Sequence, residues 1–359
     1  MEITILGSGN GGCAVAFDHS IKGHNVRIFD FEKYPRNICE IQKNGGIYSE
    51  GFLEGFAQIK YAGHDIKKAL EGAEIIYVVT PAHSIKAFAE VCKNYLQEGQ
   101  IVIVCPGSCM GSIEFKNSAG LLLCDKKIIV SETHTLPYAV RTISPGRICI
   151  YHKLNSGIFL AALPSIKTTE VLYKIKNIYP GLIKAKNVIH TSLQNGNPVI
   201  HPAVTLLNTA LIERTNGNFL FYQEGITPAV GRLIKAIDQE RINIGNLLNL
   251  EIMPDPYLGC IQKYMTVSNY DTGYSDAPGF LGIKAQNNID SRYINEDVGY
   301  GLVFWQSLAQ QIGAPTPSIL SVIHMASILL NRDYLSEGKR TMNSLGLSKY
   351  TLQDLNEIL

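Results

Sequence analysis

The sequence has little of the chemistry that marks nucleic-acid-binding, membrane or metal proteins. Its 32 lysines and arginines nearly balance its 31 aspartates and glutamates, and the net charge of +1 gives no basic surface for nucleic acid. Apolar runs such as 75–79 and 157–163 are too short to span a bilayer. The eight cysteines include no Cys-x-x-Cys pair. We therefore expect no nucleic-acid partner, no membrane partner and no metal site.

The sequence also offers no feature of a secreted protein. A first strand that begins at Ile3 leaves no room for a secretory leader, and scattered free thiols are typical of a reducing compartment. We expect a cytoplasmic protein. A length of 359 residues is large for one hydrophobic core, and 46% hydrophobic with 18% charged residues is ordinary for a globular protein. Two domains are the natural expectation.

What the sequence does contain is a glycine-rich phosphate cradle. An apolar run over 3–6 leads into a glycine-rich loop, and an apolar helical pattern follows over 13–21. The first glycine of such a loop permits a tight turn, the second lets the backbone approach a pyrophosphate, and the third lets the helix pack closely. Free N–H groups at the helix start then face the anion. We expect the cofactor to contact Gly7, Ser8, Gly9, Asn10, Gly11 and Gly12.

An acidic residue after the second strand bears on which dinucleotide binds. Asp30 ends the run 26–30, where a carboxylate hydrogen-bonds a ribose 2′-hydroxyl and repels a 2′-phosphate. This favours NAD(H), although Arg36 nearby keeps NADP(H) open. Thr80 and Pro81 follow another buried strand and are expected to line the adenine or nicotinamide side of the cofactor.

The first half of the chain alternates strands and helices. Continuous apolar runs are expected for parallel strands buried on both faces, and the region from 137 to 163 has the turn signals of antiparallel strands that complete the sheet. We predict an α/β, Rossmann-type NAD(P)-binding domain over 1–186. Its expected strands are 3–6, 26–29, 75–80, 101–105 and 128–130, and its later helices are 85–96 and 166–179.

The second half has helical spacing. Apolar stripes over 202–212, 228–250 and 319–330 predict core-facing helices, so we expect a mainly α-helical substrate domain over 187–359. The tyrosine-rich segment 253–292 interrupts this pattern and is expected to be a functional rather than a disordered loop. In such two-domain proteins the substrate lies in the crevice between the domains.

His201 is the best titratable candidate in this domain. Pro202 fits the first position of a helix, which places His201 at the N-cap boundary. A histidine is suited to exchange a proton near neutral pH, and a carboxylate partner would fix its tautomer. A helix-capping histidine without chemistry is an equal alternative.

Two charged residues further along are candidate partners. Arg292 offers a planar fork that matches a substrate carboxylate, and Asp297 sits at an apparent helix start, where it could orient His201. A surface ion pair and an ordinary helix N-terminal acid are the alternatives, and spacing alone does not decide between them.

Several stretches, in order, resemble the opine dehydrogenase family. They are Gly7–Gly12, Val188–Ser192, His201–Asn208 (His-Pro-Ala-Val-Thr-Leu-Leu-Asn), Tyr222–Pro228, Arg292–Asp297 (Arg-Tyr-Ile-Asn-Glu-Asp) and Thr316–Ser318. The resemblance implies an NAD(P)H-dependent enzyme that reduces the imine between an α-keto acid and an amino acid. It also implies His201 and Asp297 as the catalytic pair, and Arg292 as the ligand of the substrate carboxylate. Asn208, on the same helix face as His201, is either a substrate ligand or structural.

Rival functions remain at this stage. A simple 2-keto or 2-hydroxy acid dehydrogenase, or a relative of glycerol-3-phosphate dehydrogenase, has the same two-domain plan. The lack of a lysine near the His201 helix counts against a phosphate substrate. A non-catalytic NAD(H) sensor is the alternative of another class. His83 and His134 are reserve candidates beside the cofactor and for proton transfer, Glu213 and Arg214 suit exposed or intersubunit contacts, and a homodimer is compatible with the helical domain.

Overall fold

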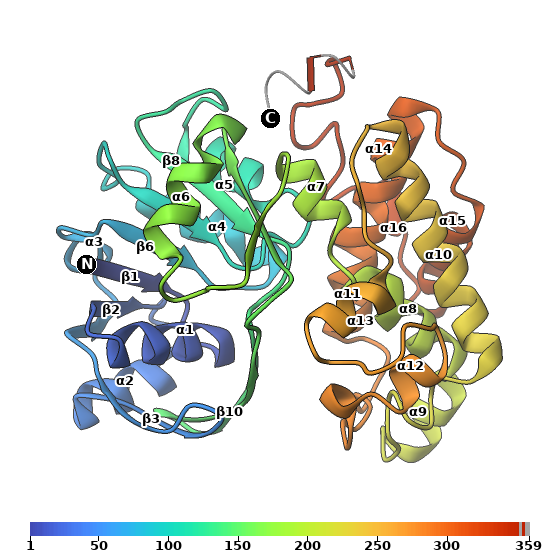
Figure 1. Ribbon diagram of the computed structural model, residues 1–359, viewed down its shortest axis with the longest axis horizontal. Helices are drawn as coiled ribbons and strands as arrows, with labels where there is room; N and C mark the ends of the chain where they lie inside the picture. The colour runs from blue at the N-terminus through green and yellow to red at the C-terminus, as the bar shows by residue number, and fades with distance from the viewer. Residues whose placement is uncertain (352–353, 356–359) are drawn as a thin grey trace. The chain divides into compact units, whose positions relative to one another are not determined.

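The computed structural model describes residues 1–351 and 354–355. Its contacts divide the chain into two compact units, 1–191 and from 192 onward, which are described separately below (Figure 1). The division falls inside the short helix α7 (Val188–Leu193). No helix of the described residues is long and apolar enough to cross a membrane.

The first unit is built on an eight-stranded sheet. Its strand order is β12-β11-β8-β7-β6-β1-β2-β5, and every neighbouring pair is parallel except β8 with β11. The central strands β6 and β7 are buried along their whole length, which explains their continuous apolar runs. The strands are β1 (Glu2–Leu6), β2 (Asn25–Phe29), β5 (Tyr61–Gly63), β6 (Ile75–Val78), β7 (Ile101–Val104), β8 (Ile129–Thr133), β11 (Ile158–Leu163) and β12 (Leu182–Lys184).

Helices connect the parallel strands and cover the sheet (Figure 1). One core cluster combines side chains of β6 and β7 with Phe88 and Ala89 of α4 and Phe115 of α5. The helices of this unit are α1 (Asn10–Ile21), α2 (Pro35–Asn44), α3 (Ile66–Leu70), α4 (Ile85–Cys92), α5 (Gly111–Ala119) and α6 (Thr168–Ile175), with single 3-10 turns at Ala82–Ser84 and Ser165–Lys167.

A second, four-stranded sheet corrects one prediction. Its order is β4-β3-β10-β9, with β3 (Gly46–Gly51), β4 (Gly55–Gln58), β9 (Tyr138–Ser144) and β10 (Arg147–Lys153). The prediction that 137–163 completes the main sheet is therefore wrong for β9 and β10. These two strands bury only part of their side chains, whereas β11 is buried throughout and can lie in the main sheet.

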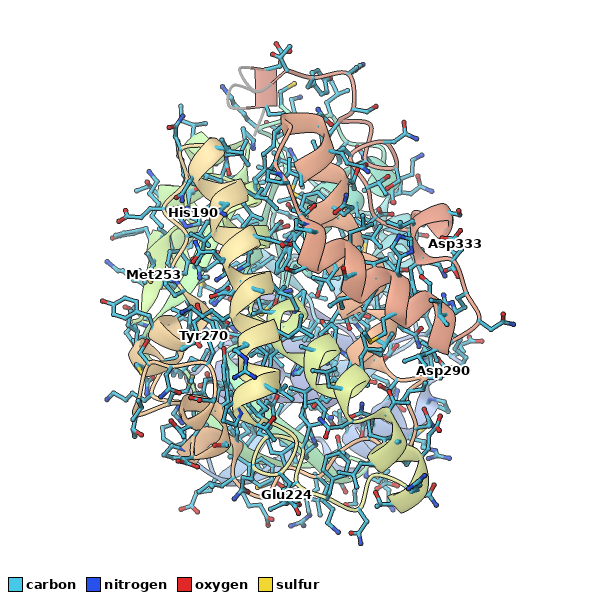
Figure 2. The ribbon with its side chains drawn as sticks, turned by 90° about the vertical axis from the view of Figure 1, so that its right-hand side faces the viewer. His190, Glu224, Met253, Tyr270, Asp290 and Asp333 are labelled. Carbon is cyan, nitrogen blue, oxygen red and sulfur yellow. The ribbon has the colours of Figure 1, made fainter. Side chains whose placement is uncertain are left out.

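The second unit is helical. The long helix α10 packs against α8 and α15 in its core, and Figure 2 shows α10 and α15 side by side. Trp305 and Arg241 are among its fully buried side chains. The helices are α8 (Asn197–Leu207), α9 (Thr209–Thr215), α10 (Pro228–Leu247), α11 (Asp255–Ile261), α12 (Thr272–Ser275), α13 (Arg292–Asn295), α14 (Val303–Ile312), α15 (Pro317–Leu329) and α16 (Tyr334–Glu337).

The tyrosine-rich segment after α10 is tied to that helix. The hydroxyl of Tyr270 donates to Asp238 Oδ2 over 2.6 Å, and Figure 2 shows Tyr270 beside α10. The hydroxyl of Tyr274 donates to Asp255, whose backbone N–H donates to Asp238. The buried Arg241 guanidinium completes this cluster by donating to Asp238. The segment is thus ordered by buried polar contacts.

Candidate active site

The glycine loop of the first unit has the geometry of a phosphate cradle. Gly7 has a φ of +107°, and a Cβ there would lie 2.4 Å from the carbonyl oxygen of Val79. A Cβ at Gly12 would lie 1.9 Å from the carbonyl oxygen of Gly7, so only glycine lets α1 start this close to the loop. Gly9, the N-cap of α1, is exposed and has open space around its Cα. Backbone N–H groups at this helix start can therefore meet an anion.

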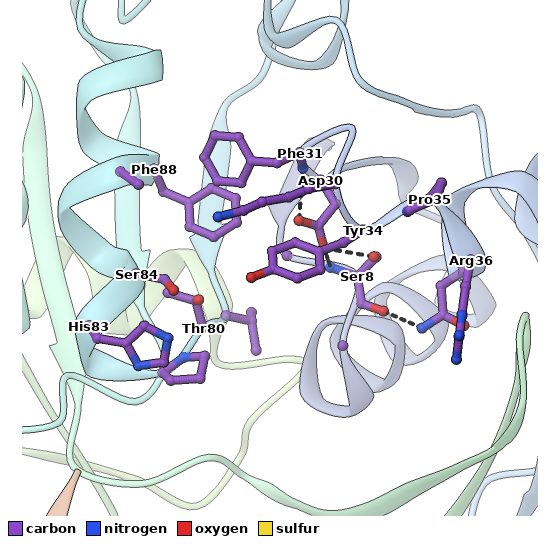
Figure 3. Close-up of a pocket in the computed structure, with 17 residues that line it drawn as sticks. Ser8, Asp30, Phe31, Tyr34, Pro35, Arg36, Thr80, His83, Ser84 and Phe88 are labelled. Atoms are coloured by element: carbon purple, nitrogen blue, oxygen red, sulfur yellow. Dashed lines mark hydrogen bonds between the residues drawn. The ribbon is translucent and has the colours of Figure 1, made fainter. Parts of the chain in front are cut away.

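A cavity of about 600 Å³ opens beside this loop (Figure 3). Six of the residues predicted to bind the cofactor line it, together with His83, Lys33 and Arg36. The predicted residues Asn10, Gly11 and Gly12 are not part of the lining. The six lining residues are Gly7, Ser8, Gly9, Asp30, Thr80 and Pro81.

The carboxylate of Asp30 is fixed from both sides. Its Oδ2 accepts hydrogen bonds from the backbone N–H and the hydroxyl of Ser8, both over 2.7 Å, and its Oδ1 accepts from the N–H of Phe31 over 2.8 Å (Figure 3). The residue is only 6% exposed. Three donors hold this acid in place at the wall of the cavity, where a ribose would present its hydroxyls.

The side chain of Asn10 contacts the second sheet and not the cavity. Its Oδ1 accepts hydrogen bonds from the N–H and the hydroxyl of Thr142 in β9, over 2.9 and 2.7 Å. Through this oxygen the side chain ties the start of α1 to the second sheet. The fit of the loop to a dinucleotide rests on Gly7, Gly9 and Gly12.

In the second unit, the structure corrects the predicted position of His201. Helix α8 begins at Asn197 with Pro198 in its first turn, and Pro202 lies inside the helix. His201 is therefore an interior residue of α8 and not an N-cap residue. Proline is tolerated in the first turn of a helix, so Pro198 fits the observed start at Asn197, which lies five residues before the expected start at Pro202.

His201 is held by hydrogen bonds at both ring nitrogens. Its Nδ1 lies 2.8 Å from Oδ2 of Asp297, and its Nε2 lies 3.0 Å from the hydroxyl oxygen of Tyr222. The ring of Tyr293 stacks on the imidazole at 3.9 Å with an angle of 13°. The carboxylate of Asp297 accepts a hydrogen bond from Nδ1–H. Neutral His201 therefore has its lone pair on Nε2, where it accepts a hydrogen bond from the Tyr222 hydroxyl.

Asp297 is buried and opens an unusual helical stretch. It is 3% exposed, and burial raises the pKa of its carboxyl, while the hydrogen bond from His201 works in the opposite direction. Residues Asp297–Leu302 form a π-helix that leads into α14. Single turns of π-helix are frequent at functional sites, where the wider turn redirects a side chain.

Arg292 precedes this stretch and has an exposed side chain. Its Nε donates to Glu296 Oε2 over 2.5 Å, and the side chain is 57% exposed while that of Glu296 is 6% exposed. The buried acid therefore holds one edge of the guanidinium. Among the described residues, the other two guanidinium nitrogens have no hydrogen-bond partner from the protein, so a carboxylate can meet them.

Asn208 is the C-cap residue of α8, and its backbone N–H still donates to the carbonyl oxygen of Val204, as it would inside the helix. It lies at the junction of α8 and α9, and its Nδ2 donates to the carbonyl oxygens of Val204 and Gly225. These contacts favour a structural role for the side chain.

Of the reserve candidates, His134 accepts a hydrogen bond at Nδ1 from the Phe159 N–H, a contact within the sheet. Glu213 and Arg214 are exposed. The described residues contain no group of three or more His, Cys, Asp or Glu arranged for a metal ion.

Sequence reasoning missed two contributors to the site. In the sequence, Tyr222 only begins a stretch that matches the family, and Glu296 is only one member of the Arg-Tyr-Ile-Asn-Glu-Asp run. Tyr222 lies in the turn between α9 and α10, where no periodic pattern assigns a direction to its side chain. Glu296 carried a usable signal, because an acid four residues after Arg292 on a helical turn can pair with it.

Comparison with known proteins gives a consistent result across both units. Residues 184–330 match the family model for the α-helical domain of NAD/NADP octopine/nopaline dehydrogenases. Residues 2–112 match the model for the N-terminus of NAD-dependent glycerol-3-phosphate dehydrogenase. The second match lies within the nucleotide-binding unit. It gives no support for a glycerol-3-phosphate dehydrogenase in the helical unit, which matches the octopine/nopaline model.

Several relatives are similar over nearly the whole chain. The opine dehydrogenase of Arthrobacter sp. (strain 1C) is 34% identical over 97% of this chain and 95% of its own length. Among solved structures, octopine dehydrogenase in complex with NADH and agmatine has a TM-score of 0.80 at 17% identity, covering 99% of this chain and 97% of that one. Yersinopine dehydrogenase with bound NADP⁺ has a TM-score of 0.74 at 15% identity, covering 100% and 97%.

These matches confirm the predicted fold class, an NAD-binding α/β domain followed by an α-helical domain. They also favour an opine dehydrogenase over the two alternatives, a simple keto-acid dehydrogenase and an NAD(H) sensor. The chain belongs to the opine dehydrogenase family, the NAD(P)-dependent oxidoreductases that reductively condense an α-keto acid with the amino group of an amino acid.

Proposed function

We propose that the protein uses NADH to join a pyruvate-like α-keto acid to the amino group of an amino acid, giving an N-(carboxyalkyl)amino acid. Octopine dehydrogenase has been solved with NADH and L-arginine and with NADH and pyruvate, which supports substrates of these classes. The observation that carries the proposal is the buried hydrogen bond between His201 and Asp297.

His201 is the proton-exchanging group in this proposal, and Asp297 orients it. A carboxylate on Nδ1 fixes the tautomer and stabilises the imidazolium that forms when Nε2 takes up a proton. In the condensing direction this proton goes to the hydroxyl of the carbinolamine, which leaves as water. Proton exchange by a positioned side chain contributes roughly 10²–10⁴ in rate.

Arg292 binds the carboxylate of the keto acid. Glu296 holds its Nε, which leaves the two terminal nitrogens of the fork for a bidentate contact. Asn208 keeps the junction of α8 and α9 closed through its two carbonyl contacts, so we assign it no substrate contact.

The cradle of the first unit holds the dinucleotide, with the pyrophosphate at Gly9 and the adenosine ribose at Asp30. When bound, the reduced nicotinamide supplies the hydride that reduces the imine carbon. Asp30 favours NADH, because its fixed carboxylate would repel a 2′-phosphate. Lys33 and Arg36 in the same cavity wall act against that preference.

A substrate screen tests the function. NADH oxidation is followed with pyruvate or 2-oxoglutarate held fixed and a panel of amino acids varied, and the product is identified by its mass. We expect turnover only when both an amino acid and a keto acid are present. Equal turnover with the keto acid alone would show a simple keto-acid reductase instead.

The cell compartment and the assembly state complete the proposal. None of the eight cysteines forms a disulfide, which supports a reducing, cytoplasmic location. A homodimer is compatible with the helical unit, and sedimentation velocity of the purified protein measures the assembly state.

A further inference from the structure

Tyr222 occupies the only direction in which Nε2 of His201 can exchange a proton. A neutral imidazole nitrogen has a single in-plane lone pair, and the Tyr222 hydroxyl oxygen lies 3.0 Å from it. With Nδ1 bonded to Asp297, the three groups form one line of hydrogen bonds from Tyr222 through His201 to Asp297. A substrate atom must reach Nε2 either through this hydroxyl or in its place.

The ring of Tyr222 is packed so that it does not readily give up this place. It stacks on Phe280 at 4.3 Å with an angle of 14° and meets Phe221 edge-on at 5.0 Å. Phe280 is itself stacked with Tyr264 and Tyr274, and Tyr222 is only 5% exposed. Moving the ring aside would break these buried aromatic contacts, which stabilise its position.

The hydroxyl also stays protonated throughout. Burial raises the pKa of Tyr222 well above its ordinary value, and the nearby Tyr293 and Asp297 raise it further. A free tyrosinate is therefore disfavoured. The hydroxyl can still carry a proton if it gives one and receives one in the same step, as in a hydrogen-bonded chain.

We infer that Tyr222 is a catalytic residue that relays the proton between His201 and the substrate. In the condensing direction the imidazolium Nε2–H passes its proton to the Tyr222 oxygen while the Tyr222 hydroxyl proton moves to the carbinolamine hydroxyl. The carbon–oxygen bond breaks, water leaves, and the nitrogen lone pair forms the C=N bond of the iminium. His201 ends neutral and Tyr222 ends protonated, so charge and atoms balance. The inference rests on the proposed function, because it needs His201 as the proton source.

Tyr222→Phe tests the relay, because it removes one oxygen and keeps the ring in its stack. We expect kcat for condensation to fall by roughly 10²–10⁴, as for His201→Ala, with NADH affinity and thermal stability near those of the parent. The matched control is Tyr264→Phe, which removes the hydroxyl of another ring in the same stack and should keep kcat within about twofold. A Tyr222→Phe enzyme with kcat within threefold of the parent overturns the relay.

A second substitution separates a relay from a merely structural hydroxyl. Tyr222→3-fluorotyrosine keeps the ring and the hydrogen bond but makes the hydroxyl more acidic. If a proton is transferred through this oxygen, both kcat and the solvent isotope effect should change. Unchanged values would contradict the relay. If His201→Ala itself retains turnover, the proposed function fails. If His201→Ala loses turnover while Tyr222→Phe keeps it, only the relay fails.

Discussion

Asp297 Oδ2 lies 2.8 Å from His201 Nδ1, although 96 residues separate the two in the chain. Both side chains are buried, and the stacked ring of Tyr293 fixes the plane of the imidazole. The contact determines which nitrogen of His201 faces away from the acid, and it gives the first prediction.

Asp297→Asn should inactivate the enzyme while leaving its fold intact. The amide is close in shape to the carboxylate but does not stabilise an imidazolium, and its NH₂ group favours the opposite tautomer. We expect kcat to fall by about 10²–10⁴ with NADH affinity unchanged. Steady-state NADH oxidation and fluorescence titration with NADH measure the two quantities. The exposed Asp276→Asn serves as the control.

Arg292→Lys should weaken keto-acid binding more than turnover. A lysine keeps the positive charge but loses the planar fork that meets a carboxylate with two hydrogen bonds. We expect KM for pyruvate to rise about tenfold, equivalent to ~1.4 kcal/mol, with a smaller change in kcat. Arg214→Lys on the exposed face of α9 is the control. An unchanged KM for the keto acid would remove Arg292 from the site.

Asp30→Ser should shift the cofactor preference towards NADPH. It removes the negative charge from the cavity wall while Lys33 and Arg36 remain there. We expect the ratio of kcat/KM for NADPH over NADH to rise by at least about tenfold. Glu32→Gln removes a charge from an exposed neighbouring residue and should leave the ratio unchanged. A ratio that moves equally in both variants would mean that net charge alone sets it.

Two alanine substitutions should separate binding from folding in the glycine loop. Gly9→Ala adds a Cβ in open space, so the protein should fold normally but bind NADH more weakly if the pyrophosphate lies there. Gly12→Ala places a Cβ 1.9 Å from the Gly7 carbonyl oxygen and should lower the melting temperature as well. Thermal unfolding with and without NADH distinguishes these effects. Normal NADH affinity in Gly9→Ala would place the pyrophosphate elsewhere.

His19 should make the first unit less stable in acid. It is fully buried against Tyr77 and Tyr179, with neither ring nitrogen hydrogen-bonded, and burial lowers its pKa well below the usual value. The nearby cations His24, Lys153 and Lys22 lower it further, and the buried Asp18 beside Lys153 does not offset them.

The folded pKa of His19 lies below the unfolded one, so the unfolded state takes up the proton first. The free energy of unfolding is therefore highest above about pH 6.5 and falls as the pH drops below that value. His19→Leu should reduce the pH slope by up to one proton, about 1.4 kcal/mol per pH unit. Hydrogen exchange of α1 at pH 5 to 7 measures this, because the single tryptophan, Trp305, reports on the second unit. The exposed His324→Gln should keep the slope of the parent.

The parallel sheet and the glycine loop could be predicted from the sequence, because both produce strong local patterns. The strands of the main sheet are buried on both faces, and the three spaced glycines occur at one loop. The second sheet could not be predicted, because β3 and β4 are short and partly exposed and therefore show only a weak alternation of apolar and polar residues. No local pattern predicts that 46–58 pairs with 138–153.

In the second unit, the residues of the site were easier to predict than their positions in helices and their contact partners. Residue chemistry makes His201 and Asp297 candidates, and the resemblance implies their roles. The predicted start of α8 is wrong because two prolines four residues apart both fit a helix start. Tyr222 reaches His201 from a turn that also pairs with a distant segment, through the β-bridge between Leu220 and Lys284. Such a contact is decided by tertiary packing and leaves no mark in composition or periodicity.

The π-helical stretch that begins at Asp297 has a consequence for altering this enzyme. A π turn contains one more residue than the α turn it replaces, so chain length between the acid and α14 decides where the carboxylate points. Removing one residue from 298–302 would swing the acid by roughly a quarter turn away from the imidazole, since each helical residue turns the chain by about 100°. Spacing is thus as much a part of this acid–base pair as residue identity, and relatives that differ in length there would have to rebuild the contact from another position.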